Sequence, residues 1–249
     1  MGTLKDKVAF VTGAGSGIGK AIALLYAKEG ARVVVSDIND EHGQAVAEEI
    51  KSAGGDAIYV KANTAVPEEV EQLVEKTVEK YGRLDIACNN AGIGGEQNPA
   101  ADMSISGWKN IIDINLNGVF YGCKYATAQM LKNGGGAIVN VGSIHSITAV
   151  PGAVGYAASK HAVLGLTRNF GVEYAAQNIR VNAIGPGYID TPLLDQMDAE
   201  QKKTLVSKHP VGRLGTAEEV ANLTLFLSQD TSTFINGSYF NIDGGYTAI

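Results

Sequence analysis

Residues 8–19 read Val8-Ala-Phe-Val-Thr12-Gly13-Ala14-Gly15-Ser16-Gly17-Ile18-Gly19, a buried-strand pattern that passes directly into a glycine-rich turn. Helical spacing follows the turn, from Ala21 to Lys28. The glycines match T-G-x-x-x-G-x-G and depart from G-x-G-x-x-G, because Lys20 stands where the last glycine of that pattern would be. Glycines at such a junction let a pyrophosphate approach the backbone amides and the positive end of the helix. The turn is therefore a candidate phosphate cradle.

The same unit of strand, turn and helix repeats along the chain. We expect further strands at 32–37, 57–60, 84–88, 137–141, 180–184 and 238–242, and further helices at 41–51, 67–80, 106–131, 155–176 and 218–227. Strands separated by helices pair in parallel through right-handed crossovers. The predicted fold class is α/β, a doubly wound, Rossmann-type parallel sheet of about seven strands flanked by helices.

Length and composition limit the kind of protein this is. The chain has 249 residues, 45% hydrophobic and 18% charged, which predicts one domain over residues 1–249. A net charge of -6 without a basic run argues against a nucleic-acid partner. No apolar run approaches the ~18 residues of a membrane span, the first residues do not read as a signal peptide, and two cysteines give no disulfide framework. We therefore expect a cytoplasmic protein without a membrane partner.

Asp37 ends the second expected strand, where a dinucleotide site places the group that reads the adenosine ribose. A carboxylate there accepts hydrogen bonds from both ribose hydroxyls and repels a 2′-phosphate. The nearby positions Ser16 and Ile38 supply no cation to pair with such a phosphate. The predicted cofactor is therefore NAD and not NADP.

Tyr156 and Lys160 are four residues apart in an expected helix, so both side chains face the same way. A cation beside a phenol favours the phenolate and moves a group that titrates near ~10 toward neutral pH. The pair is a candidate general acid/base.

Taken together, the motifs resemble those of the short-chain dehydrogenase/reductase family over essentially the whole chain. The matching features, in chain order, are Thr12-Gly13-x-x-x-Gly17-x-Gly19, Asn89-Asn90-Ala91-Gly92, Asn115 in Asn-Leu-Asn-Gly, Ser143, Tyr156-x-x-x-Lys160 and Pro186-Gly187. The resemblance implies hydride transfer between a nicotinamide and a secondary alcohol or ketone.

The resemblance also implies four catalytic residues. Tyr156 would exchange the proton with the substrate oxygen, and Ser143 would orient that oxygen. Lys160 would bind the nicotinamide ribose and lower the pKa of the tyrosine. Asn115 would bend its helix and hold a water that links the lysine to solvent.

The resemblance also implies cofactor contacts, most of them in the turns that follow the strands. They are Gly13, Ser16, Gly17, Ile18, Gly19, Asp37, Ile38, Asn63, Asn89, Ala91, Gly92, Tyr156, Lys160, Pro186, Gly187, Ile189 and Thr191. Asn63 departs from the family, which commonly has aspartate there for the adenine amino group. Asparagine still offers a carbonyl oxygen, so we expect altered adenine binding and not its loss.

The expected substrate contacts are Ser143, His145, Tyr156 and Tyr188, under a lid at about 190–212 with an apolar face that includes Leu194 and Leu205. His145 resembles a carboxylate-binding histidine of 3-hydroxybutyrate dehydrogenases, but Ala153 stands where those enzymes have a lysine. The alternative, that His145 is only a hydrogen-bonded residue of the fold and does not bind substrate, is left open. The other histidines lack ligand spacing, so no metal site is predicted.

Several functions remain open at this stage. An NAD-dependent alcohol dehydrogenase or ketone reductase leads, with a 3-oxoacyl carrier-protein reductase, a 3-hydroxy acid dehydrogenase or a hydroxysteroid dehydrogenase as alternatives. A non-catalytic dinucleotide-binding regulator is disfavoured because Asn115, Ser143, Tyr156 and Lys160 are all present. In the family the helices at 106–131 and 155–176 pair between subunits, which implies a homotetramer.

Overall fold

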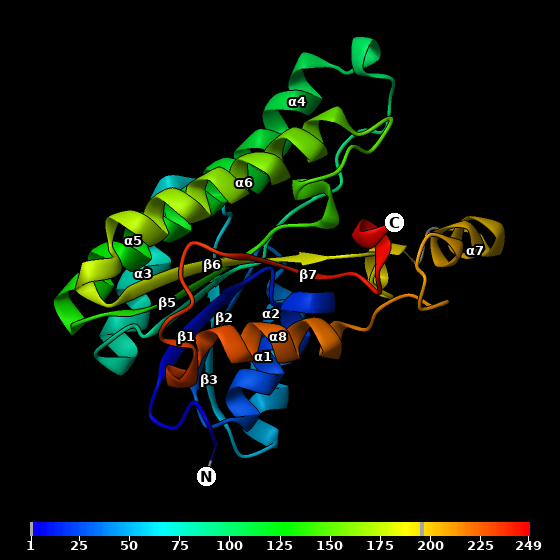
Figure 1. Ribbon diagram of the computed structural model, residues 1–249. Helices are drawn as coiled ribbons and strands as arrows, with labels where there is room; N and C mark the ends of the chain where they lie inside the picture. Colours follow the sequence, from blue (N-terminus) through cyan, green and yellow to red (C-terminus); the bar gives the residue numbers. More distant parts are fainter. Residues whose placement is uncertain (1, 195–196) are drawn as a thin grey trace.

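The computed structural model describes residues 2–194 and 197–249. Its centre is one sheet of seven parallel strands in the order β3-β2-β1-β4-β5-β6-β7 (Figure 1). The chain crosses over after β3, so the turns that follow β1 and β4 meet at the middle of one sheet edge, the usual place for a ligand in such folds. The strands are β1 (Val8–Thr12), β2 (Arg32–Asp37), β3 (Asp56–Lys61), β4 (Ile86–Asn89), β5 (Gly136–Val141), β6 (Ile179–Pro186) and β7 (Tyr239–Ile242). The predicted doubly wound α/β sheet is confirmed.

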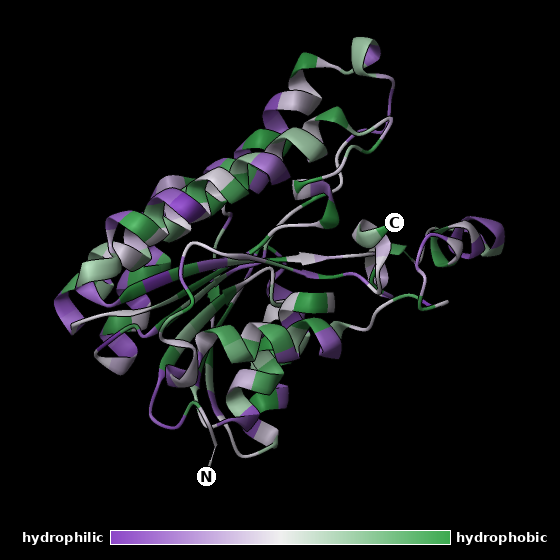
Figure 2. Ribbon diagram, viewed as in Figure 1, coloured by the Kyte–Doolittle hydropathy of each residue, from purple (hydrophilic) through white to green (hydrophobic). Residues whose placement is uncertain are grey.

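Helices cover both faces of the sheet (Figure 1). One layer holds α1 (Gly17–Lys28), α2 (Asp40–Ser52) and α8 (Ala217–Ser228), and the other holds α3 (Pro67–Tyr81), α4 (Ile105–Ile112), α5 (Gly118–Asn133) and α6 (Val154–Glu173). Successive residues of a strand face opposite sides. Ala9 and Val11 of β1 accordingly pack in the core under the first layer, and Val8 and Phe10 pack in the core under the second. Figure 2 shows the apolar strands enclosed between the two layers.

The expected helix over 106–131 is broken into two. A five-residue π-helical segment, Asp113–Asn117, separates α4 from α5. Such segments often mark functional sites, and this one contains the predicted catalytic residue Asn115.

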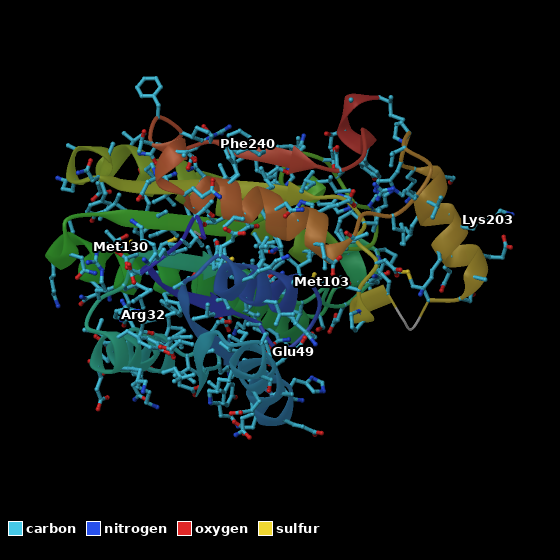
Figure 3. The ribbon with its side chains drawn as sticks, turned by 90° about the horizontal axis from the view of Figure 1, so that it is seen from below. Arg32, Glu49, Met103, Met130, Lys203 and Phe240 are labelled. Carbon is cyan, nitrogen blue, oxygen red and sulfur yellow. The ribbon has the colours of Figure 1, made fainter. Side chains whose placement is uncertain are left out.

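Helix α7 (Ala199–Ser207) was not predicted from the sequence, which indicated only a lid around 190–212. It lies beyond the carboxyl end of β7, near the C-terminus (Figure 1). Figure 3 places Lys203 of α7 at one end of the molecule and Met130 of α5 toward the other. Residues 195 and 196 of the expected lid lie outside the described residues.

Within residues 2–194 and 197–249, no helix is both long enough and apolar enough to cross a membrane.

Candidate active site

The glycine-rich turn after β1 needs glycine for two reasons. Gly13 and Gly17 have φ values of 61° and 52°, in the left-handed region that favours glycine. A Cβ on Gly19 would lie 2.1 Å from the carbonyl oxygen of Gly13, so any side chain there would push helix α1 off the turn. Ser16 is the N-cap of α1, and Ile18 lies in its first turn. The structure thus places the predicted cradle at the start of a helix.

Thr12 and Asn90 fasten this turn to the next strand of the sheet. The Thr12 hydroxyl accepts hydrogen bonds from the backbone N–H groups of Asn90 and Ala91, at 3.0 and 3.1 Å. The Asn90 side chain donates to the backbone carbonyl of Thr12 at 2.9 Å. Neither Thr12 nor Asn90 was singled out as a site residue, although both belong to recognised motifs. Their position at the ends of adjacent strands was the available signal.

Asp37 bridges the end of β2 to the glycine turn. Its Oδ2 accepts a hydrogen bond from the backbone N–H of Gly15 at 2.8 Å, and its Oδ1 accepts one from Asn39 at 2.9 Å. A Cβ on Gly15 would lie 2.9 Å from that Oδ2. The side chain of the neighbouring Ile38 is exposed. The predicted ribose-reading carboxylate therefore lies directly beside the predicted phosphate cradle.

Two of the predicted cofactor residues have side chains that are otherwise engaged. The Asn63 Oδ1 accepts a hydrogen bond from the Ala65 backbone at 3.0 Å, which leaves one lone pair for a ligand. Asn89 is buried below α5 and donates to Asn140 at 2.8 Å. The expectation that Asn89 supports the sheet therefore fits the structure, whereas a cofactor contact by its side chain does not. Burial among β5 and α5 is the reason for this correction.

Asn115 ties the π-helical segment to the loop after β4. Its side chain and the backbone of Ile93 exchange two hydrogen bonds, Ile93 N–H to Oδ1 at 2.8 Å and Nδ2 to the Ile93 carbonyl at 2.9 Å. Asn115 is fully buried. A Cβ on the predicted contact Gly92 would lie 3.2 Å from Asn115 Oδ1 and 3.6 Å from Lys160 Nζ. Gly92 thus keeps open the space between the amide and the amine.

Ser143 and Tyr156 are brought together at the end of β5 and the start of α6. A side-chain hydrogen bond joins them and lowers the pKa of the Tyr156 phenol, but burial has the larger effect and raises that pKa overall. Ser143 is held from two sides. Its Oγ accepts from the backbone N–H of His145 at 3.2 Å, and Tyr239 donates to its backbone carbonyl at 2.5 Å.

Lys160 is buried, with 4% of its surface exposed, and its Nζ donates to the Val141 carbonyl at 2.8 Å. Burial lowers the pKa of this amine to about 8. The Nζ lies 5.8 Å from the centre of the Tyr156 ring. The sequence led us to expect a lowered pKa for Tyr156, whereas burial of the phenol raises its pKa and the Ser143 hydroxyl offsets only part of that rise.

The segment after β6 closes the site opposite the glycine turn. Pro186 ends β6, and the backbone N–H of Gly187 donates to the Ile242 carbonyl at 3.0 Å. Ile189 is buried and forms a β-bridge with Gly215. A Cβ on Gly17 would lie 3.5 Å from the Thr191 side chain, so the two predicted cofactor segments face each other across a space that glycine leaves open.

Aromatic and histidine rings gather around Tyr156. The ring centre of His145 lies 6.2 Å from Tyr156, 6.1 Å from Tyr188 and 6.2 Å from Tyr246. His209 packs on both Tyr188 and Tyr246, at 5.8 and 5.6 Å. We call these five residues the ring cluster. His145 and Tyr188 were predicted as substrate contacts, whereas Tyr246 and His209 were missed because only the tertiary fold brings them here.

Burial lowers the pKa of the His145 imidazole, with a further contribution from Lys208. His145 Nδ1 contacts the Thr148 hydroxyl at 3.0 Å, and its Nε2 contacts the Tyr188 hydroxyl at 3.4 Å. Among the described residues, no group of three or more His, Cys, Asp or Glu side chains could hold a metal ion.

The chain matches known proteins over nearly its full length. A family model described as enoyl-(acyl carrier protein) reductase matches residues 13–247. A cyclohexanol dehydrogenase of Acinetobacter sp. (strain SE19) is 49% identical over 98% of this chain and 96% of its own. A 3-oxoacyl-[acyl-carrier-protein] reductase of Thermotoga maritima is 41% identical over 97% and 98%. A crystal structure of a short-chain type dehydrogenase/reductase from Mycobacterium marinum superposes with a TM-score of 0.94 at 37% identity, covering 99% of this chain and 97% of that one.

With this fold and these matches, the chain belongs to the short-chain dehydrogenase/reductase family. It is an oxidoreductase of the class that acts on alcohols and ketones.

Proposed function

We propose that this protein is an NAD-dependent dehydrogenase that interconverts secondary alcohols, cyclic ones in particular, with their ketones. The observation that carries the proposal is the ring cluster. It includes Tyr156, which pairs with the Ser143 hydroxyl and lies beside the buried amine of Lys160. Flat aromatic faces with a few polar groups beside a proton donor suit a compact, mostly apolar substrate with one hydroxyl or carbonyl group.

The predicted cofactor residues fit a dinucleotide. Glycines 13 to 19 would cradle the pyrophosphate at the start of α1, and Asp37 would accept from the adenosine ribose hydroxyls. The segment from Gly187 to Thr191 would meet the nicotinamide end, since Thr191 faces Gly17 across the open space. When bound, the nicotinamide accepts or supplies the hydride. The carboxylate of Asp37 favours NAD, because it would repel the 2′-phosphate of NADP.

Four side chains would handle the substrate oxygen and its proton. Tyr156 would donate the proton in ketone reduction and take it in alcohol oxidation, and Ser143 would hold the substrate oxygen toward it. Lys160 would exchange that proton with a water held by Asn115, which would link the lysine to solvent. The opening that Gly92 leaves between Asn115 Oδ1 and Lys160 Nζ supports this route.

The lowered pKa of His145 bears on the hydroxy-acid alternative. A neutral imidazole at neutral pH is a poor partner for a carboxylate, and the hydrogen bonds of His145 to Thr148 and Tyr188 already engage both ring nitrogens. The 49% identity to a cyclohexanol dehydrogenase adds independent support for a ring-shaped alcohol.

A second candidate is reduction of a 3-oxoacyl group on a carrier protein. The 41% identity to such a reductase favours it. The net charge of -6 and Asp37 weigh against it, because that reaction would want NADP and a basic surface for an acidic carrier.

A substrate panel separates the two candidates. Cyclohexanol, 2-hexanol and 3-hydroxybutyrate are offered with NAD and with NADP, and an acetoacetyl carrier protein is offered with NADH and with NADPH. We expect cyclohexanol with NAD to give the highest kcat/KM. The highest value for the carrier protein with NADPH would overturn the proposal and establish the alternative.

We further propose that the chain works as a single domain with a lid at 190–212, as a homotetramer in the cytoplasm. The free, buried Cys88 and Cys123 are compatible with a reducing compartment. A monomer mass in light scattering would contradict the tetramer.

A further inference from the structure

His209 has no role in any of the steps above. It lies two residues after the end of α7 and is buried, with 4% of its surface exposed. Its ring makes two hydrogen bonds, and each ring nitrogen takes part in one of them. Nε2 lies 3.2 Å from the backbone nitrogen of Tyr188, and Nδ1 lies 2.9 Å from the Leu205 carbonyl oxygen.

The two partners fix the proton on one ring nitrogen. A backbone N–H only donates, so Nε2 of His209 accepts from Tyr188 and carries no proton. A carbonyl oxygen only accepts, so Nδ1 carries the proton and donates it to Leu205. The neutral Nδ1-protonated imidazole is the form that satisfies both contacts, and it connects α7 to the segment after β6.

Gly187 makes this connection possible. A Cβ at position 187 would lie 2.8 Å from His209 Nε2, closer than real Cβ atoms come, and 3.0 Å from the Asp243 Cα. The glycine of the Pro186-Gly187 motif therefore provides the room in which the imidazole reaches the backbone of the next residue.

The C-terminal segment packs on the same imidazole. The Tyr246 ring centre lies 5.6 Å from His209 and 6.0 Å from Tyr188. The backbone N–H of Val211 donates to the Gly244 carbonyl at 3.2 Å, which holds that segment beside the histidine. His209 thus contacts two walls of the ring cluster, and neither contact involves the proton-transfer groups.

We propose that His209 is a positioning residue that sets substrate specificity by holding the backbone of Tyr188 against the end of α7. The inference rests on the proposed function, because it takes Tyr188 as a wall of the substrate site. Loss of the Tyr188 anchor would loosen that wall while Tyr156, Ser143 and Lys160 keep their own hydrogen bonds. We therefore expect the KM for the alcohol to rise while kcat changes little.

Two substitutions of His209 separate the anchor from general packing. The His209→Gln side chain reaches as far as Nε2 and offers an oxygen that accepts from Tyr188. The His209→Asn side chain ends near the position of Nδ1, so it keeps a donor for Leu205 but falls short of Tyr188. Both are smaller than or similar to histidine, and a cavity of about 320 Å³ lined in part by His209 leaves room for either.

The first readout is hydrogen–deuterium exchange of the Tyr188 amide, which needs no substrate. We expect exchange at least tenfold faster in His209→Asn and near the wild-type rate in His209→Gln. The second is kinetics with the alcohol that turns over best. We expect the KM to rise about tenfold in His209→Asn, with kcat within a factor of three, and rescue in His209→Gln.

Thr204→Gly is the control for loosening of α7 alone, because the Thr204 hydroxyl bonds only within that helix, to the Glu200 carbonyl. It should leave the Tyr188 exchange rate unchanged. Equal exchange in the asparagine and glutamine variants, or an unchanged rate in His209→Asn, overturns the inference. Failure of cyclic alcohols in the substrate panel refutes only the proposed function, since the exchange result stands without them.

Discussion

The two ends of the predicted ligand crevice are built in different ways. At the adenosine end, three hydrogen bonds join Thr12, Gly15, Asp37 and Asn90, and each of them pairs a backbone group of one turn with a side chain from another. At the substrate end, the ring cluster joins side chains from residue 145 to residue 246 through ring contacts and through hydrogen bonds of the His145 and His209 rings. A backbone-built site tolerates little change and holds one kind of ligand. A site built from side chains alters with each substitution.

This difference explains why one ligand is easier to infer than the other. The cofactor end is specified by glycine positions and one carboxylate, which are visible as motifs. The substrate end depends on which rings the fold brings together. The predictions below test whether the two ends really act independently.

The largest effect is expected from Tyr156→Phe, which removes the only hydroxyl that we propose as proton donor. We expect kcat to fall about 10³-fold, or about 4 kcal/mol of transition-state stabilisation. NADH binding, followed by the fluorescence of the bound nicotinamide, should stay within a factor of three. Retention of more than a tenth of the turnover would remove Tyr156 from the mechanism.

Ser143→Ala serves as the companion to that variant. It keeps the phenol but removes its hydrogen-bonding partner. We expect a smaller loss than for Tyr156→Phe, again without a change in NADH binding. A loss confined to NADH binding in either variant would break the distinction between the two ends.

Asp37→Asn should affect the opposite end and leave the substrate end unchanged. The amide retains the size and one oxygen of the carboxylate but loses the charge, so the hydrogen bond from Gly15 can persist. We expect the ratio of kcat/KM for NAD to that for NADP to fall about thirtyfold, or about 2 kcal/mol. The KM for the alcohol at saturating cofactor should not change. Wild-type enzyme that prefers NADP from the outset would refute the role of Asp37.

Tyr246→Leu tests the ring cluster from its C-terminal wall. The substitution removes an aromatic ring that packs on His145, Tyr188 and His209. We expect the KM for cyclohexanol to rise about tenfold, or about 1.4 kcal/mol, while cofactor affinity is unchanged. Tyr246→Phe keeps the ring and should stay near wild type. Equal losses in both variants would mean that the hydroxyl, and not the ring, is what matters.

Most of the fold could be predicted from the sequence because parallel strands buried on both faces leave continuous apolar runs. Strands β1 and β2 have the predicted bounds, and the others differ by one or two residues at one or both ends. The bend at Asn115 that the family resemblance implied is the π-helical segment between α4 and α5, but the pairing of Asn115 with Ile93 could not be predicted, because Ile93 is distant in sequence. Helix α7 was missed because its residues are mostly polar and exposed.

The site shows the same division. The glycine spacing and the position of Asp37 at the end of β2 were enough to predict that Asp37 lies beside the glycine-rich turn. Sequence spacing could not reveal that Asn89 turns into the sheet, or that His209 and Tyr246 join the ring cluster. Sequence spacing also could not show that burial raises the pKa of Tyr156, since burial is a property of the whole fold.

The smallest effect is expected from Lys160→Met. It is a change in the free energy of unfolding, and it should depend on pH. Burial lowers the pKa of Lys160 from 10.5 to about 8 in the folded protein, so holding the charged amine costs about 3 kcal/mol at pH 7. The cost is present in full below pH 8, declines as the pH rises from 8 to 10.5, and vanishes above that. Removal of the amine also leaves the Val141 carbonyl without its hydrogen bond, a loss of about 2 kcal/mol.

These two terms nearly cancel at pH 7, so we expect the free energy of unfolding of Lys160→Met to lie within about 1 kcal/mol of wild type there. Near pH 10 the variant should be less stable than wild type, because most of the charge cost is gone and the lost hydrogen bond outweighs what is left. Urea unfolding of both proteins at the two pH values measures this, with Lys76→Met as a control at an exposed helical lysine. A stability difference that does not change with pH would mean that Lys160 is not charged at a cost in the folded protein. The role of Lys160 would then rest only on its burial and on its position beside the Tyr156 ring.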